Sequence, residues 1–353
     1  MAGKVSQVST VGAARRHSTH QLHANSQRRN PLRMYRVQLQ GNVGDCERPP
    51  GNQRKFAVVS QEWTTRPERS NVWAIRFIVW VALTFGRRVS RGLLYPICFY
   101  FVIFSAQARA ASRKYLDRAL GRRSTLRDGF RHCFFFASTI LDRIFLLNEQ
   151  NILFEVRVEG EEIFKEVISD GRGCFLIGAH MGSFEVLHAL SRDQGHVQTS
   201  MVMYEENARK LNTVLKNINP RRNPPVISLG KIDSMLKVRE ALERGECIGI
   251  LADRAISGEK MISCEFLGGS VKFPAGPFRL AAILERPIML MFGLYQGGNR
   301  YNIYLERLVD LQHVPHSERD AAIEQSVRQF ARRLEHYCRE SPYNWFNFYD
   351  FWK

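Results

Sequence analysis

Several patterns that identify metal or nucleophile sites are missing from this chain of 353 residues. Its seven cysteines are scattered, and none lies in a Cys-x-x-Cys pair. That distribution is typical of reduced thiols facing the cytosol and argues against a zinc site or a disulfide framework. Neither Gly-x-Ser-x-Gly nor His-Glu-x-x-His occurs. The signatures of a serine-hydrolase elbow and of a helical zinc site are therefore absent from the sequence.

Acidic residues are scarce: 34 Asp and Glu stand against 51 Lys and Arg, which gives a formal net charge of +17. Such a charge predicts an anionic partner, and nucleic acid, anionic lipid headgroups and an acidic carrier protein all qualify. The sequence has no RNA-binding aromatic signature and no evident helix-turn-helix, which disfavours nucleic acid. The basic residues flank apolar runs, so an acidic membrane surface is the better match.

No apolar run reaches the ~20 residues that a membrane-spanning helix needs. The two longest runs, Val72–Phe85 and Leu93–Ser105, carry Trp, Tyr and Arg at their edges. This composition suits the membrane interface and predicts a membrane-associated helical segment over residues 66–112. We expect a monotopic hairpin or one short, tilted span there. A pair of core helices is the alternative.

Residues 1–65 are rich in Ser, Gln, Asn, His and Arg and follow neither a helical nor a strand period. We expect a disordered basic tail, and the segment lacks the apolar region that a signal peptide needs. A start codon placed further along the gene would equally explain such a segment, so it is not assumed to be translated in the native protein.

Residues 113–353 read as one α/β domain. A helical pattern extends to residue 147, and after Gly160 apolar strands alternate with amphipathic helices. This alternation predicts a largely parallel central sheet flanked by helices. The expected strands cover residues 153–158, 173–179, 199–204, 227–228, 247–252, 288–295 and 301–305. The expected helices cover residues 161–170, 184–192, 208–217, 231–243, 276–284 and 317–341, and residues 266–273 look like a hairpin or loop.

The most informative motif is Gly178–Glu185. An apolar strand ends at His180, Gly182 permits a tight turn, and Ser183 is a good helix cap, which puts Glu185 in the first helical turn. Open α/β sheets bind ligands at the carboxyl ends of their strands. We expect Glu185 to accept a hydrogen bond from one imidazole nitrogen, so that the other can take a proton from a hydroxyl.

A purely structural His–Glu pair is the competing interpretation of this motif. Ser183 as a nucleophile is unnecessary, because the capping role accounts for it. A metal site is not expected, since no third ligand lies near His180 and Glu185 in the sequence.

Asp253 and Arg254 follow a second apolar strand. They can form a surface ion pair, or they can face the cleft, where Arg254 would bind a phosphate or orient an acyl donor.

A third motif is rich in glycine and proline. Its glycines permit positive φ or a close backbone approach, and the helix that follows would offer amide groups to an anion. A plain connection between strand and helix is the alternative. The residues expected to line a substrate cleft are Gly268, Gly269, Phe273, Pro274 and Gly276.

Together and in this order, the motifs resemble the bacterial late lipid A biosynthesis acyltransferase family. That family belongs to the wider lysophospholipid and glycerol-3-phosphate acyltransferase superfamily with its His-x-x-x-x-Asp/Glu motif. The resemblance covers about residues 70–350 and implies a glycerol-3-phosphate acyltransferase-like fold. It maps the catalytic pair onto His180 and Glu185, and substrate positioning onto Asp253 and Arg254.

The resemblance also implies a reaction: fatty acyl transfer from acyl carrier protein, or acyl-CoA, to a hydroxyl of a lipid or glycolipid. By the same resemblance, we expect the reaction to take place at the cytoplasmic face of the bacterial inner membrane and to need neither cofactor nor metal. Glu205 stands where these enzymes usually carry an Arg, and the aromatic C-terminus is similar to relatives from aryl polyene lipid pathways. The acceptor class therefore stays wide. A lipid hydrolase using the same His–Glu pair and a non-catalytic lipid-binding protein are the alternatives.

Overall fold

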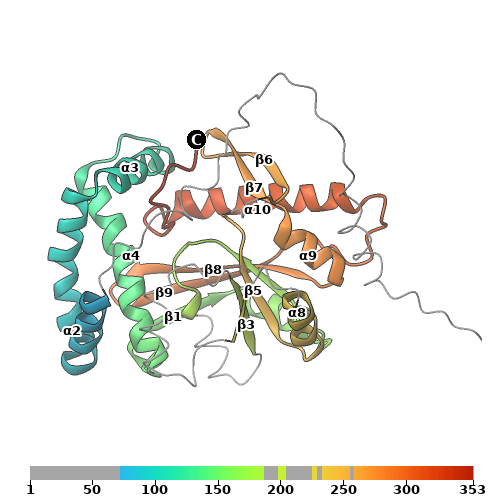
Figure 1. Cartoon of the computed structure of the whole chain (residues 1–353), viewed down its shortest axis with the longest axis horizontal. Coiled ribbons are helices and arrows are strands. Elements are labelled where there is room, and N and C mark those ends of the chain that lie inside the picture. The colour runs from blue at the N-terminus through green and yellow to red at the C-terminus, as the bar shows by residue number, and fades with distance from the viewer. Residues whose placement is uncertain (1–71, 187–197, 204–224, 229–232, 255–257, 353) are drawn as a thin grey trace, which may run out of the picture. The chain divides into compact units, whose positions relative to one another are not determined.

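A computed structural model describes residues 72–186, 198–203, 225–228, 233–254 and 258–352 (Figure 1). The described strands of the main sheet follow the order β1-β9-β8-β2-β5-β3-β4. Every neighbouring pair is parallel except β8 and β9, which form an antiparallel pair. The strands are β1 (Glu155–Glu159), β2 (Phe175–Gly178), β3 (Thr199–Met203), β4 (Val226–Ser228), β5 (Cys247–Leu251), β8 (Ile288–Gly297) and β9 (Arg300–Arg307).

The central strands are apolar throughout because both faces of the sheet are covered. Phe175 and Ile177 of β2 point into a core built with α3, α8, α9 and α10, whereas Leu176 points into a second core built with α2, α4 and α5. Uninterrupted apolar strands are what a parallel sheet buried on both faces requires. The helices are α2 (Val72–Phe104), α3 (Ala106–Leu120), α4 (Leu126–Leu147), α5 (Glu161–Ile168), α8 (Ser234–Glu243), α9 (Gly276–Leu284) and α10 (Arg319–Glu340), with a short 3-10 turn at Asn151–Leu153.

A separate antiparallel hairpin, β6 (Met261–Phe266) and β7 (Gly269–Pro274), lies beside α10 (Figure 1). Leu267 and Gly268 form its two-residue turn, and both have positive φ (49° and 71°). Such turns favour a glycine, because both central residues are left-handed.

The predicted α/β class with a largely parallel sheet flanked by helices is confirmed. The helix predicted over residues 276–284 has those bounds, and the predicted edge strand at 153–158 is β1. The helix predicted over 184–192 begins at Phe184, but its remainder lies outside the described residues, as does the helix predicted over 208–217.

The two apolar runs near the start of the described chain lie on two helical parts of α2, which meet in a kink at the non-helical Gly86 (φ 77°, ψ 177°). Among the described residues no single helix is long and apolar enough to cross a membrane. α2 and α3 meet the combined requirement of length and apolar composition only as a pair, bent by 95° at their junction. Large apolar side chains of α2 are exposed, from Trp73 (74% exposed) to Phe104 (66%).

A buried ion pair fixes α2 to the rest of the domain. Arg87 donates from Nε to Asp142 Oδ1 (2.7 Å) and from Nη2 to Oδ2 (2.9 Å). Tyr301 on β9 donates its hydroxyl to the same carboxylate (2.8 Å). Because Asp142 on α4 is fully buried, removing Arg87 would leave an uncompensated charge in the interior. The position of α2 is therefore tied to α4 and to the sheet.

Candidate active site

His180 and Asp253 lie side by side, just beyond the ends of two neighbouring strands. β2 and β5 are parallel neighbours with Gly178 opposite Leu251, and the amide of Ala252 donates to the carbonyl of Gly178 (2.9 Å). One alanine follows each strand end, and the next residue is His180 after β2 and Asp253 after β5. Both groups therefore stand at the carboxyl edge of the sheet, where open α/β folds bind their ligands.

The His180 ring is held by a buried carboxylate. Its Nδ1 lies 2.8 Å from Asp253 Oδ1, and its own backbone amide donates to the same oxygen (3.1 Å). Asp253 is only 2% exposed, whereas the imidazole is 28% exposed. A carboxylate partner assigns the proton to Nδ1, which leaves Nε2 as the nitrogen that can accept a proton.

The electrostatics keep the two groups in complementary states. Burial and the nearby Arg254 guanidinium lower the pKa of His180 below its usual 6.5, although Asp253 acts in the opposite direction. Burial alone would raise the pKa of Asp253, but His180, Arg254 and the Trp345 N–H outweigh it and bring that pKa to about 2. At neutral pH the site therefore holds a carboxylate and a neutral imidazole, which is the state that a general base requires.

The side chain of Arg254 contacts the C-terminal segment. Its Nη2 donates to the carbonyl of Phe346 (3.2 Å), and its guanidinium lies 5.4 Å from the centre of the Tyr349 ring. The side-chain hydrogen bonds of Asp253 go to His180 and Trp345. Of the two arrangements that the sequence left open, a surface ion pair between Asp253 and Arg254 does not match these contacts.

Glu185 lies in the first helical turn, as expected, but its carboxylate contacts residues other than His180. Its carboxylate is 2.9 Å from Arg143 Nε on α4 and accepts a hydrogen bond from Ser183 Oγ (3.2 Å). We expected Glu185 to accept a hydrogen bond from one imidazole nitrogen of His180, but the carboxylate bonded to the ring, at Nδ1, is that of Asp253. The cation on α4 is the physical reason, because it attracts the Glu185 carboxylate away from the imidazole. A catalytic part for Glu185 stays a prediction.

Position 182, in the turn between His180 and Ser183, accommodates only glycine. Gly182 has φ 64°, and a Cβ there would stand 1.9 Å from the carbonyl oxygen of Gly293 on β8. This close approach lets the amide of Ser183 donate to that carbonyl (2.8 Å). The tight turn inferred from the sequence is thus required by contact with β8.

The glycine- and proline-rich residues pack against neighbouring elements. A Cβ on Gly269 would stand 2.9 Å from Trp352, and the carbonyl of Gly268 accepts from Arg118 (3.0 Å). Phe273 is fully buried in the core, and Pro274 ends β7. The amide of Gly276 donates to Glu259 (2.7 Å), so this group of the α9 N-terminus already has an anionic partner. A cleft-lining role for these residues stays a prediction.

Sequence reasoning missed the contribution of Trp345. Its indole Nε1 donates to Asp253 Oδ2 (3.0 Å), and the ring is fully buried. The available signal was the aromatic C-terminus, which we used only as a likeness to relatives. Glu205, which bears on the choice of acceptor, lies outside the described residues.

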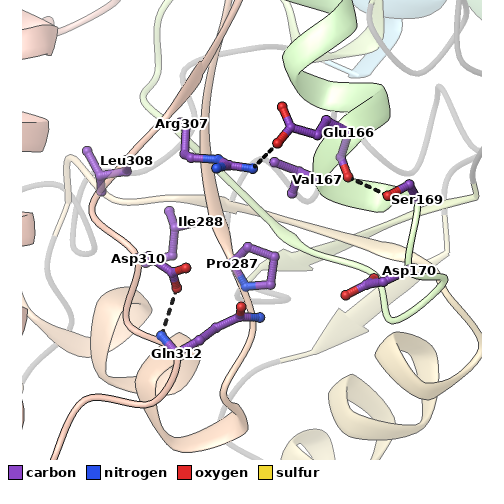
Figure 2. Close-up of a pocket in the computed structure, with 10 residues that line it drawn as sticks. All are labelled: Glu166, Val167, Ser169, Asp170, Pro287, Ile288, Arg307, Leu308, Asp310 and Gln312. Atoms are coloured by element: carbon purple, nitrogen blue, oxygen red, sulfur yellow. Dashed lines mark hydrogen bonds and ion pairs between the residues drawn. The ribbon is translucent and has the colours of Figure 1, made fainter.

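One pocket lies at the opposite edge of the sheet (Figure 2). It is lined near the start of β8 by Pro287 and Ile288 and near the end of β9 by Arg307, which pairs with Glu166 (3.5 Å). β8 runs parallel to β2, so this is the edge away from His180. The pocket contains no residue predicted for the site. Among the described residues no cluster of three or more His, Cys, Asp or Glu side chains is arranged to hold a metal ion.

Fold and site together define an α/β protein with a histidine, hydrogen-bonded to a buried carboxylate, at the carboxyl edge of its sheet. The family model for bacterial lipid A biosynthesis acyltransferases matches residues 60–353, and the chain belongs to that family. A comparison with curated proteins gave no match. Family membership indicates an acyltransferase that acts on a lipid acceptor.

Proposed function

We propose that this protein transfers a fatty acyl group from the thioester of acyl carrier protein, or of acyl-CoA, to a hydroxyl of a lipid or glycolipid. The site of action is the cytoplasmic face of the bacterial inner membrane. The single observation that carries the proposal is the neutral, partly exposed His180 held by the buried Asp253 carboxylate, within a chain of this family. A base of this kind activates a hydroxyl without a covalent enzyme intermediate.

The chemical step follows from the tautomer. Nε2 of His180 takes the proton of the acceptor hydroxyl while the oxygen of that hydroxyl attacks the thioester carbonyl. The tetrahedral intermediate then collapses, the carbon–sulfur bond breaks, and the imidazolium returns its proton to the leaving thiolate. Asp253 stabilises the imidazolium between these events, because its carboxylate accepts the Nδ1–H bond throughout.

Arg254 is proposed to position substrate. It stands directly after Asp253 and is half-buried, so its charge is close to the reacting groups. A guanidinium binds phosphate oxygens well, and both donors carry a phosphopantetheine arm. The glycine-rich hairpin around Gly268 and Gly269 and the turn from Phe273 to Gly276 are proposed to border the substrate cleft.

Glu185 is proposed as a second acidic member of the site. Arg143 and Ser183 hold its carboxylate at the start of the helix that follows His180. Because this charge is already balanced by Arg143, Glu185 is proposed to act through the position of that helix and not as a charge on the imidazole.

The exposed face of α2 supports attachment to a membrane surface. Trp73, Phe77 and Trp80 are each more than half exposed, and Arg76 places its guanidinium 5.6 Å from the centre of the Trp73 ring. Aromatic side chains next to arginines suit the boundary between lipid headgroups and acyl chains. An enzyme held there would meet a lipid acceptor in the plane of the membrane.

Acyl transfer by membranes that carry the wild-type protein, His180→Ala or Glu185→Ala tests the proposal. Labelled acyl carrier protein and acyl-CoA are supplied separately with extracted bacterial lipids, and both lipid product and free fatty acid are followed. Labelled lipid that disappears with His180→Ala supports the transferase and identifies its donor. Free fatty acid alone would indicate a hydrolase, and wild-type product from His180→Ala would refute the base.

A further inference from the structure

The chain returns to the His180 turn after its last helix. The amide of Gly182 donates to the carbonyl of Asn344 (2.9 Å), and the amide of Phe346 donates to the carbonyl of His180 (2.8 Å). Between these bonds, Trp345 forms an antiparallel bridge with Met181. Residues 344–346 are thus bonded directly to the turn that carries His180.

The side chain of Trp345 reaches the partner of His180. Its indole N–H donates to Asp253 Oδ2 (3.0 Å), while Asp253 Oδ1 accepts from the His180 ring (2.8 Å). Each carboxylate oxygen therefore has its own donor, which fixes the plane of the carboxylate as well as its position. Both Trp345 and Asp253 are buried, so water does not readily replace the indole as a donor.

The indole itself is immobilised from several sides. The rings of Tyr115, Phe266 and Phe351 lie edge-on to it, with centroids 5.0, 5.3 and 4.9 Å away. The backbone carbonyl of Trp345 accepts from His132 Nε2 on α4 (2.8 Å). Turning the indole away from Asp253 would break this packing, so its N–H is aimed at the carboxylate before any substrate binds.

We propose that Trp345 is a positioning residue of the active site, whose indole N–H holds the Asp253 carboxylate in the orientation that lets it accept the Nδ1–H of His180. The proposal rests on the function proposed above for His180. The C-terminal segment thereby becomes part of the catalytic apparatus, since the His180 backbone and the Asp253 side chain are both bonded to residues 345 and 346.

Trp345→Phe tests the proposal, because it keeps an aromatic ring in the core and removes the N–H donor. Trp352→Phe is the matched control. Trp352 lies in the same segment, packs on the same Phe266 ring and also donates its indole N–H, but to the carbonyl of Phe266 (3.2 Å). We expect kcat to fall about 10- to 100-fold for Trp345→Phe with KM unchanged, and about twofold or less for the control.

A double-mutant cycle separates positioning from packing. In the Asp253→Ala background no carboxylate remains for the indole to orient, so adding Trp345→Phe should change kcat by less than about twofold. A purely structural role would lower kcat by the same factor in both backgrounds, and that outcome would overturn the proposal. Equal activities of Trp345→Phe and Trp352→Phe would overturn it as well.

If Trp345→Phe fails to fold, benzothienylalanine at position 345 gives the same test. This analogue keeps the bicyclic shape and replaces the N–H with sulfur, so it removes the donor without leaving a cavity. We expect the same loss of kcat and a smaller fall in melting temperature than for Trp345→Phe, because only the hydrogen bond and not the packing is lost. Wild-type kcat would overturn the proposal. His180→Ala in the same assay distinguishes the two hypotheses: if it retains activity, the proposed function itself fails, whereas its inactivity beside a fully active analogue refutes only the role of Trp345.

Discussion

Nδ1 of His180 lies 2.8 Å from Oδ1 of Asp253, although 73 positions separate the two residues in the chain. The contact exists because β2 and β5 are neighbours in the sheet and both end at the same edge. The imidazole thus receives its charge partner from the next strand, and the carboxylate closer in sequence, Glu185, pairs with Arg143.

Asp253→Asn should abolish most of the activity. An Asn side chain can donate to Nδ1, which would favour the wrong tautomer and put the proton on Nε2. We expect kcat for acyl transfer to fall about 10²- to 10⁴-fold with a smaller change in KM. Asp350→Asn is the control. Asp350 forms a partly exposed ion pair with Lys114 (2.8 Å), and this pair does not contact the imidazole. Equal activity of the two variants would contradict the assignment of Asp253.

Arg254→Gln should move the acidic limb of the pH–rate profile to higher pH. A general base must be neutral, so kcat rises as pH increases through the pKa of His180, which lies below 6.5 in the wild type. Arg254 is one of the causes of that lowering, since its positive charge disfavours the imidazolium. Removing the charge raises the pKa, and the enzyme then loses activity at a higher pH on acidification.

Arg254→Lys is the matched control for this shift, because it keeps the charge and changes the geometry. Measuring kcat at saturating donor separates the titration of His180 from weaker substrate binding. A limb that stays in place in Arg254→Gln, or that moves equally in Arg254→Lys, would show that the charge of Arg254 does not reach the imidazole.

Glu185→Gln should leave that acidic limb where it is in the wild type. The carboxylate on Nδ1 is that of Asp253, so neutralising Glu185 removes a charge already balanced by Arg143. We expect kcat to fall less than in Asp253→Asn. If instead the limb moves to lower pH in Glu185→Gln and stays in place in Asp253→Asn, the imidazole pairs with Glu185 in the working enzyme.

The contrast between these carboxylates shows how far the sequence could lead. β2 and β5 were predictable because each is an apolar run that ends in a polar residue, and such runs are typical of a buried parallel sheet. That His180 stands at a strand end therefore followed from local pattern. Its partner did not follow, because the choice between Glu185 and Asp253 depends on the strand order and on the cation at position 143, which a one-dimensional pattern does not contain.

Trp345 illustrates the same limit more strongly. Its indole N–H donates to Asp253, although 92 positions, including the whole of α10, separate the two residues in the chain. An aromatic cluster at the end of a sequence indicates packing, but the sequence does not say which buried carboxylate receives an indole N–H. The kink in α2 at Gly86 is similar: the two apolar runs were visible in the sequence, whereas the kink between them and the packing of α2 against α4 were not.

Replacing the exposed aromatic residues of α2 should release the protein from membranes. Trp73, Phe77 and Trp80 are 74%, 56% and 55% exposed, so serine at all three positions removes apolar surface without opening the core. Each buried side chain contributes about 1.5–3 kcal/mol on transfer from water, so we expect vesicle binding to weaken by at least about 100-fold. Flotation with vesicles that contain anionic phospholipid measures this.

A matched triple variant tests whether the effect belongs to α2. Leu126, Ile152 and Ile163 are also exposed apolar residues (75%, 96% and 42%), but they lie on α4, the 3-10 turn and α5. Serine at these three positions should leave flotation unchanged. Equal loss in both variants would mean that apolar surface in general, and not the α2 face, carries the binding.

His132 should make the protein less stable as the pH falls from 6.5 to 4. Its ring is fully buried: Nδ1 lies 2.7 Å from Ser112 Oγ, and Nε2 donates to the carbonyl of Trp345. Burial lowers the pKa of His132 to about 4, against about 6.5 in an unfolded chain. Between these values His132 is protonated in the unfolded chain but neutral in the folded one. The contribution of neutral His132 to the free energy of unfolding is therefore complete above pH 6.5. It decreases by roughly 3 kcal/mol as the pH falls to 4.

Melting temperatures in detergent from pH 4 to pH 7 measure this dependence. His132→Gln cannot titrate in that range, so its melting temperature should be lower than that of the wild type at pH 7 but should decline less steeply on acidification. His336→Gln is the control, because His336 is exposed beside Glu340 on α10. The wild type and His132→Gln declining in parallel would refute the assignment. A steeper decline in the wild type would identify His132, which donates to the Trp345 carbonyl, as a group whose protonation destabilises the fold in acid.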